Sequence, residues 1–425
     1  MRYCCLLLSI LLTTTTHAQW SQYLGPKGDS TSPETGLLDE WPADGPKELW
    51  RIEMGPGFGA AAVDGDEAFL LDRVLGEADV LRVLEVKTGK EKWRYRYDAP
   101  GRVGFEGSRC TPSVTDTHIF TTGEFGHLHA FDRKTRKVAW SINLLEKYPD
   151  DDGNDKQGWG YGMNPLVVGE TIVAASYASE HPGLIAFDQK TGDVAWESEA
   201  FGGSSMYSSP IIRTIAGVQG IAVRNIKNFF FIDLATGKTL FKHECYTKGK
   251  IPITPVTVMP DGEHVFITQG YEMGSVMLKI TRDGDNFNVE EKYRTIEGSQ
   301  IHPPIAIGEH LYINHGENAT HGKAKRKFAG LACVDPTNGN VVWNTGADPF
   351  IGRGALLYAD GKLIMQDAEG GMLFLVDPSP DKFKPISSFR ATDAKNKKAW
   401  APLSLANGLL IVRDQNEMVC FDLKK

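Results

Sequence analysis

The stretch Asp188–Trp196, which reads DQKTGDVAW, decides the fold because its pattern recurs along the chain. An acidic residue opens the stretch, a turn follows, and an aromatic residue stands eight positions after the acid. The same spacing returns at Glu85–Trp93, Asp132–Trp140, Asp233–Phe241 and Asp335–Trp343. Copies at one fixed spacing indicate a chain built from repeated structural units.

Each copy predicts a β-hairpin. An apolar or alternating run such as Leu184–Phe187 precedes the acid, and a short strand begins near the aromatic residue. The carboxylate can accept backbone N–H bonds across the turn, and Gly192 supplies the positive φ that closes a bulged hairpin. We expect the aromatic residue to pack against the neighbouring unit.

The spacing of the units predicts a β-propeller. The aromatic residues at 93, 140, 196, 241 and 343 are separated by 47, 56, 45 and 102 residues, and the last gap contains a degenerate copy that ends near Tyr293. A period of about 50 residues is typical of a four-stranded propeller blade. Third-strand runs near 83, 130, 186, 231, 278, 332, 375 and 420 predict eight blades. Seven blades are the alternative, because the units around Tyr293 and Phe389 are eroded.

The two ends of the chain predict how the ring closes. The last unit contains the runs Leu409–Val412 and Met418–Asp422 but no outer strand, whereas Glu48–Ile52 resembles an orphan outer strand. Pairing these segments would complete one blade and remove free strand edges. We therefore assign residues 46–425 to the propeller and residues 19–45 to an N-terminal extension.

The repeated block resembles the PQQ-like (pyrroloquinoline quinone) β-propeller repeat family, over roughly residues 19–425. The chain is also similar to an exported bacterial subgroup of that family through Trp20–Pro26 and Ser32–Leu37. The resemblance implies an all-β propeller. It implies little about activity, because one fold hosts many functions.

Composition and the N-terminal residues predict an exported, soluble protein. Residues 1–18 combine Arg2, the apolar run Tyr3–Leu12 and Thr16–Ala18, which is the pattern of a cleaved secretory signal peptide. No later run is long and apolar enough to span a bilayer. The net charge is −8, and the basic residues are scattered apart from the short run Lys323–Lys327, so we expect no nucleic-acid partner. We expect a periplasmic or secreted monomer.

The cysteines favour a structural role. Cys4 and Cys5 stand before the apolar run of the signal and not at its cleavage point, which argues against a lipid anchor. The other four cysteines are widely spaced and form no C-x-x-C pair, which argues against a thiolate metal site or a redox motif. We expect them to be buried small apolar side chains; they are Cys110, Cys245, Cys333 and Cys420.

The residues that open the first strand of each blade should converge on one mouth of the central channel. Phe58 and Thr254 are two of them, and the predicted ligand-binding set is Arg109, Tyr161, Asn164, Tyr207, His302, Arg353 and Trp400. Planar hydrogen-bonding groups and two guanidinium ions could hold an anionic or sugar-like ligand. The alternative is that these side chains satisfy one another and plug the channel.

A second cluster suggests a metal site only superficially. His302, His315, Glu317 and His321 are residue types that bind metals, but their spacing is not diagnostic and the last three fall in a polar loop. We therefore predict a solvated loop and no metal. Asn318–Thr320 matches a glycosylation acceptor.

Three functions compete. Quinoprotein alcohol dehydrogenases of the resembled fold use PQQ with calcium and a vicinal disulfide, but no adjacent cysteines follow residue 18 and the calcium ligands have no match here. Outer-membrane assembly lipoproteins of the resembled fold are scaffolds. The third possibility is a small-molecule or glycan receptor, or a hydrolytic accessory, that uses the channel-mouth residues; no nucleophile, base and orienting group can be assigned to a reaction. We therefore predict a non-catalytic binding or scaffold protein for a protein, glycan or small anionic ligand, without a cofactor. The alternatives are a quinoprotein dehydrogenase that uses PQQ with calcium and a scaffold similar to the outer-membrane assembly factors.

Overall fold

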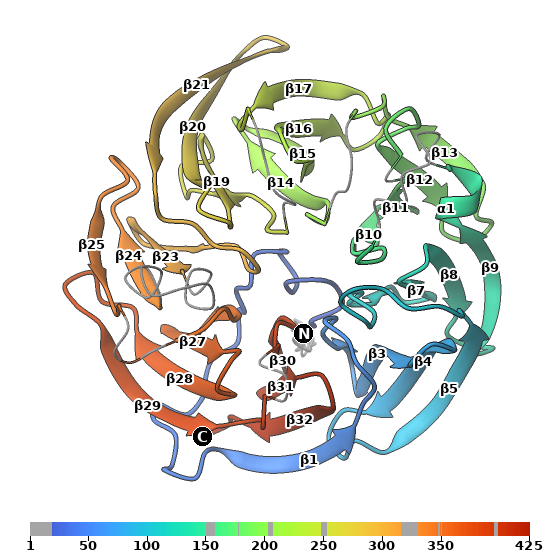
Figure 1. Ribbon diagram of the computed structural model, residues 1–425, viewed down its shortest axis with the longest axis horizontal. Coiled ribbons are helices and arrows are strands. Elements are labelled where there is room, and N and C mark those ends of the chain that lie inside the picture. The colour runs from blue at the N-terminus through green and yellow to red at the C-terminus, as the bar shows by residue number, and fades with distance from the viewer. Residues whose placement is uncertain are drawn as a thin grey trace, which may run out of the picture.

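The structure is a ring of eight four-stranded sheets arranged radially, as Figure 1 shows. This computed structural model describes residues 19–149, 158–176, 178–202, 207–247, 253–315, 330–346, 349, 351–394 and 398–425. Within those ranges the single helix is α1 (Leu144–Lys147). The eight-bladed prediction is confirmed and the seven-bladed alternative is excluded. The predicted signal peptide lies outside the described residues.

Within each blade the strands follow one another from the channel outward, and the last blade combines both ends of the chain. In chain order the blades are β2 (Ala62–Asp64), β3 (Glu67–Val74), β4 (Ala78–Glu85) and β5 (Glu91–Asp98); β6 (Ser113–Val114), β7 (His118–Thr122), β8 (His127–Asp132) and β9 (Lys137–Asn143); β10 (Leu166–Val168), β11 (Thr171–Ala175), β12 (Leu184–Asp188) and β13 (Val194–Glu197); β14 (Ile211–Ile215), β15 (Val218–Arg224), β16 (Asn228–Asp233) and β17 (Thr239–Glu244); β18 (Thr257–Val258), β19 (His264–Gln269), β20 (Gly274–Asp283) and β21 (Asn286–Thr295); β22 (Ile305–Ile307), β23 (His310–Asn314), β24 (Leu331–Val334) and β25 (Val341–Asn344); β26 (Leu356–Ala359), β27 (Lys362–Asp367), β28 (Met372–Asp377) and β29 (Lys384–Arg390); and β30 (Ser404–Ala406), β31 (Leu409–Arg413), β32 (Glu417–Asp422) and β1 (Lys47–Glu53).

The outer hairpin of the third blade shows the bulge that the repeat predicted. The register between β12 and β13 shifts between Ala186, which pairs with Trp196, and Phe187, which pairs with Val194. The Asp188 carboxylate accepts hydrogen bonds from the backbone N–H groups of residues 190 and 191, at 2.8 and 2.9 Å. The acidic residue of the motif therefore holds the turn, as expected.

The aromatic residue of one blade packs on the turn of the next blade. The Trp140 Nε1–H donates to the backbone oxygen of Gln189 at 2.9 Å, and the Trp140 ring lies against Gly192 so closely that a Cβ there would be 2.7 Å from it. The same contact joins Trp50 to Gly89, Trp196 to Gly237, and Tyr293 to Gly339. The motif glycine therefore allows a positive φ and also makes room for the neighbouring blade.

The ring closes by pairing the two ends of the chain. β1 is antiparallel to β32, with Trp50 opposite Cys420, and the blue strand lies beside the red one in Figure 1. Trp50 is buried, and its Nε1–H donates to the backbone oxygen of Val86 in the first blade at 2.8 Å. The predicted closure is confirmed.

Residues 19–45, here called the strap, run across one face of the ring before β1 begins. Isolated bridges join the strap to three blades through the pairs Trp20 with Val63, Thr31 with Tyr358, and Leu37 with Lys424. Arg213 of β14 donates to the backbone oxygens of Lys27 and Gly28, at 2.9 and 2.7 Å. Val63, Arg213 and Tyr358 lie in first strands, and Lys424 follows the third strand of the last blade, so the strap covers this end of the channel.

The four described cysteines are buried, as predicted, and none of them forms a disulfide bond. Burial raises the pKa of the Cys110 thiol to about 12 and that of Cys245 to about 11. These thiols are therefore protonated at neutral pH and pack as apolar groups. No helix within the described ranges has the length and apolarity needed to cross a membrane.

Candidate functional site

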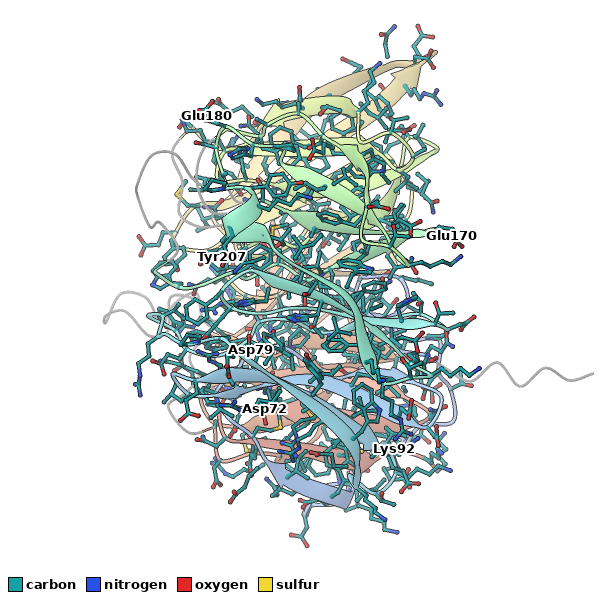
Figure 2. The ribbon with its side chains drawn as sticks, turned by 90° about the vertical axis from the view of Figure 1, so that its right-hand side faces the viewer. Asp72, Asp79, Lys92, Glu170, Glu180 and Tyr207 are labelled. Atoms are coloured by element: carbon teal, nitrogen blue, oxygen red, sulfur yellow. The ribbon has the colours of Figure 1, made fainter. Side chains whose placement is uncertain are left out.

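A pocket of about 320 Å³ lies at the other end of the channel, where the first strands begin. We call it the mouth pocket. Its wall contains six of the seven predicted site residues, namely Arg109, Asn164, Tyr207, His302, Arg353 and Trp400. Figure 2 shows Tyr207 toward one side of the ring and Glu170, which lies in the turn between β10 and β11, toward the opposite side. The mouth pocket and the strap therefore occupy opposite ends of the channel.

Two guanidinium groups flank a pair of stacked rings in this pocket. The Phe58 and Trp400 rings are stacked with centroids 5.5 Å apart and an interplanar angle of 20°. The Arg109 guanidinium lies 5.3 Å from the centroid of Phe58, and that of Arg353 lies 4.6 Å from the centroid of Trp400. Cation–π attraction stabilises both contacts, so the four side chains form one ordered row.

Neighbouring groups fix both arginines. Arg109 donates to the backbone oxygens of Phe105 at 2.6 Å and of Gly107 at 3.1 Å. Arg353 donates to Gln300 Oε1 at 2.9 Å and lies 3.7 Å from Glu369 Oε1. The described residues of the wall include both guanidinium groups and no carboxylate, and the Glu369 carboxylate beside Arg353 offsets part of the positive charge.

His302 is neutral at physiological pH. Burial lowers its pKa to about 4. Its Nε2 lies 3.0 Å from the backbone oxygen of Trp400; because a carbonyl oxygen only accepts, Nε2 carries the proton and Nδ1 a lone pair. Neither His302 Nδ1 nor Trp400 Nε1 has a hydrogen-bond partner among the described residues. Buried polar atoms of this kind are rare, and they recur at sites completed by a ligand or water.

Asn164 and Tyr207 order the wall by bonding to the protein itself. Asn164 Oδ1 accepts from the backbone N–H of Thr111 at 2.6 Å, and its Nδ2 donates to Ser209 Oγ at 2.8 Å. The Tyr207 hydroxyl donates to the backbone oxygen of Gly160 at 2.6 Å. These residues match the alternative in which predicted site residues satisfy one another, whereas His302 Nδ1 and Trp400 Nε1 have no hydrogen-bond partner among the described residues.

Tyr161 and Thr254 lie outside the pocket wall. The Tyr161 hydroxyl donates to the backbone oxygen of Ala175 at 3.0 Å, inside the core of the third blade. Successive side chains of an extended chain point to opposite sides, so Gly162 and Asn164 reach the pocket while Tyr161 faces the core. Thr254 donates to the backbone oxygen of residue 268 at 3.0 Å.

The pocket also contains residues that the sequence did not suggest. Phe105 lies 5.9 Å from Trp400 and 5.8 Å from Trp159, measured between ring centroids, and Trp159 is 38% exposed at the rim. Gln300 holds Arg353, and Tyr23 reaches the pocket from the strap. Trp159 begins the glycine-containing stretch Trp159–Gly162. An aromatic residue in such a turn is the one feature of the sequence that could have indicated these additional pocket residues.

A buried ionic cluster supports the loop that carries Phe105 and Arg109. The fully buried guanidinium of Arg73 lies 3.2 Å from Asp79 Oδ1 and 2.7 Å from Glu124 Oε1. Glu124 accepts from the backbone N–H of Gly107 at 2.7 Å, next to the carbonyls that hold Arg109. Burial raises the pKa of Asp79 to about 6, against the opposing effect of Arg73.

The described residues do not fit a metal or a calcium–PQQ site. No group of three or more His, Cys, Asp or Glu side chains that could hold a metal occurs within the described ranges. His315 is buried and pairs with Glu297, so the predicted solvated loop is wrong for this residue. Glu317, His321 and Asn318–Thr320 lie outside those ranges. Calcium needs several oxygen ligands, usually including carboxylates, which the described wall of the mouth pocket does not supply.

Comparison with known proteins identifies the family. The sequence profile described as outer membrane protein assembly factor BamB, a PQQ-repeat family, matches residues 77–345. The chain belongs to this family. The match spans most of the ring and agrees with the repeat seen in the structure.

Individual relatives of this chain are distant. The dehydrogenase subunit of alcohol dehydrogenase (quinone) from Komagataeibacter europaeus is 25% identical over 126 residues, which cover 28% of this chain and only 16% of that protein. Two crystal structures share the fold. BamB from Moraxella catarrhalis has a TM-score of 0.58 at 11% identity, covering 89% of this chain and 99% of that one. Quinohemoprotein alcohol dehydrogenase from Comamonas testosteroni has a TM-score of 0.64 at 12% identity, covering 96% and 81%.

Proposed function

We propose that this protein is an exported, non-catalytic binding protein whose mouth pocket holds a compact planar anion, such as an aromatic carboxylate. The row formed by Arg109, Phe58, Trp400 and Arg353 carries this proposal. The aromatic side chains line the pocket with apolar surface for a planar ligand, and guanidinium groups bind carboxylates through paired, charge-assisted hydrogen bonds. The volume of about 320 Å³ lies at the lower end of the range for small-molecule sites.

The contacts of Ser209, the one serine in the described wall of the pocket, are not those of an activated nucleophile. Ser209 Oγ accepts hydrogen bonds from both the backbone N–H and the side-chain amide of Asn164, at 3.0 and 2.8 Å. His302 donates its one proton to the Trp400 carbonyl oxygen. Binding, rather than activation of a nucleophile, is the chemistry these contacts support.

The test is binding of 2-naphthoate, a planar aromatic carboxylate, measured by titration calorimetry and by quenching of tryptophan fluorescence. We expect Arg353→Ala and Trp400→Ala each to weaken binding at least tenfold, a loss of about 1.4 kcal/mol or more. Arg102→Ala is the matched control, because Arg102 lies on the loop that carries Arg109 and its side chain is 66% exposed. Unchanged affinity in both pocket variants, or no binding to the wild type, would refute the proposal.

A quinoprotein oxidoreductase is the second candidate, because a quinone-type alcohol dehydrogenase is among the relatives of this chain. PQQ is a planar polyanion, but the described wall of the mouth pocket lacks the carboxylates that bind its calcium, so this candidate is supported by the relative alone. The purified protein should be incubated with PQQ and calcium and assayed for quinone absorbance and dye-linked alcohol oxidation. A positive result in both assays would replace the binding proposal.

A scaffold that docks another protein at the mouth is the third candidate. Trp159 at the rim and Leu75 in the turn between β3 and β4 are large apolar side chains that are 38% and 40% exposed. A Trp159→Ser and Leu75→Ser double variant that loses a partner in cross-linking of the native host's envelope fraction, while keeping 2-naphthoate affinity, would favour docking over small-ligand binding.

A further inference from the structure

The channel contains a second chamber on the strap side of the ring. Its volume is about 830 Å³, and its wall combines strap residues such as Gln22 and Lys27 with first-strand residues such as Arg213. Tyr23 and Asn164 line both this chamber and the mouth pocket. These two side chains therefore form the boundary between the two compartments.

Only one of the two boundary side chains has a polar group left for a ligand. The amide of Asn164 is engaged by Thr111 and Ser209, as described above. The Tyr23 hydroxyl makes no hydrogen bond with any described residue, and burial raises its pKa, so it stays a protonated donor. Its side chain is partly exposed, inside the channel.

The strap holds Tyr23 in place from its N-terminal side. Trp20 is 1% exposed and exchanges backbone hydrogen bonds with Val63 at 2.9 and 3.0 Å. The backbone oxygen of Ser21 accepts from the N–H of Val114 at 2.8 Å. These contacts join the strap to the first two blades and hold the backbone just before Tyr23, which sets where its ring enters the channel.

We propose that Tyr23 determines the specificity of the mouth pocket. Its ring closes the floor and limits the length of the ligand, and its hydroxyl bonds a polar group at the end of the ligand remote from the guanidinium groups. This inference rests on the proposed function, since it concerns the same ligand. It narrows that ligand to a compact aromatic carboxylate with a polar substituent opposite the carboxylate.

The test compares three probes on the full-length mature protein by titration calorimetry: 2-naphthoate, 6-hydroxy-2-naphthoate and the longer biphenyl-4-carboxylate. The wild type should bind the hydroxylated naphthoate more tightly than 2-naphthoate and should bind the biphenyl at least tenfold more weakly. Tyr23→Ala should join the two chambers and remove most of the tenfold penalty on the biphenyl. Tyr23→Phe should keep that penalty but lose the preference for the hydroxyl, about three- to tenfold, as expected for one hydrogen bond.

Gln22→Ala is the matched control, because Gln22 lies on the same segment but lines the strap-side chamber alone. It should leave all three affinities unchanged. If the wild type binds 2-naphthoate but Tyr23→Ala still rejects the biphenyl and Tyr23→Phe still prefers the hydroxyl, the role of Tyr23 is refuted and the proposed function stands. If the wild type binds neither naphthoate, both fail. Should Tyr23→Ala not fold, the Tyr23→Phe comparison decides alone.

Discussion

Gly89→Ala tests whether the motif glycine is needed for its backbone angle or for the neighbouring blade. Gly89 has a φ of +68°, and a Cβ at this position would lie 2.7 Å from the Trp50 ring. A left-handed backbone costs an alanine about 1–2 kcal/mol, and forcing an atom into a packed contact costs about 1–3 kcal/mol. We expect the free energy of unfolding to fall by about 2–5 kcal/mol, measured by guanidinium denaturation followed by circular dichroism.

A double-mutant cycle separates the two costs. In a Trp50→Ala background the ring is gone, so Gly89→Ala should cost at least about 1 kcal/mol less than in the wild type. Gly169→Ala is the control for the backbone alone, because Gly169 has a φ of +56° in an exposed turn and no atom lies within 4 Å of its added Cβ. If the losses of unfolding free energy caused by the Gly89 and Trp50 substitutions add within about 0.5 kcal/mol, the contact of Trp50 with the turn does not explain why glycine is needed at position 89.

Three further predictions concern buried ionisable groups. Because burial raises the pKa of Asp79 to about 6, its proton stabilises the folded state below about pH 4, and this contribution is lost as the pH rises through about 6. The stability advantage of the wild type over Asp79→Asn should therefore shrink by about 2 kcal/mol between about pH 4.5 and pH 7 in urea denaturation; a constant difference would contradict it. Arg73→Met should lower the free energy of unfolding at pH 7 by about 3–5 kcal/mol in the same assay, because it leaves two carboxylates buried without their cation. The His302 ring should remain neutral down to about pH 5 in nitrogen NMR spectra, because burial lowers its pKa to about 4. A titration near the ordinary pKa of histidine would show that the ring is accessible to water.

The fold could be predicted from the sequence because the information is local and repeated. The nine residues Asp188–Trp196 are enough to predict a bulged hairpin, and each copy of the motif predicts the same hairpin again. Even the eroded unit that ends near Tyr293 keeps the aromatic contact, with Tyr293 packed on Gly339. The strand of Trp50 could be paired with the strand of Cys420 because each end of the chain contains a strand without a partner, and pairing the two completes a blade.

The site was predictable only in part, because its residues come from different kinds of segment. Residues that open first strands, such as Arg353 and Trp400, are brought together by the ring itself and could be named in advance. Tyr23 could not, because nothing in the repeat says which side chain of the strap enters the channel. The prediction was wrong for Tyr161, whose side chain faces the core of the blade. Successive side chains of an extended chain alternate between two sides, so a shift of one residue exchanges a pocket position for a core position.

The blade that joins β1 to β32 has a consequence for the order of folding. Residues 47–53 meet residues 417–422, so the pairing spans nearly the whole chain and carries the largest loop-closure entropy of any sheet in the molecule. The other seven blades each form from one continuous stretch and can assemble as the chain emerges. We therefore expect circularisation to be the slow, final step, and until it occurs β32 has no neighbour on its outer side and aggregation competes with folding.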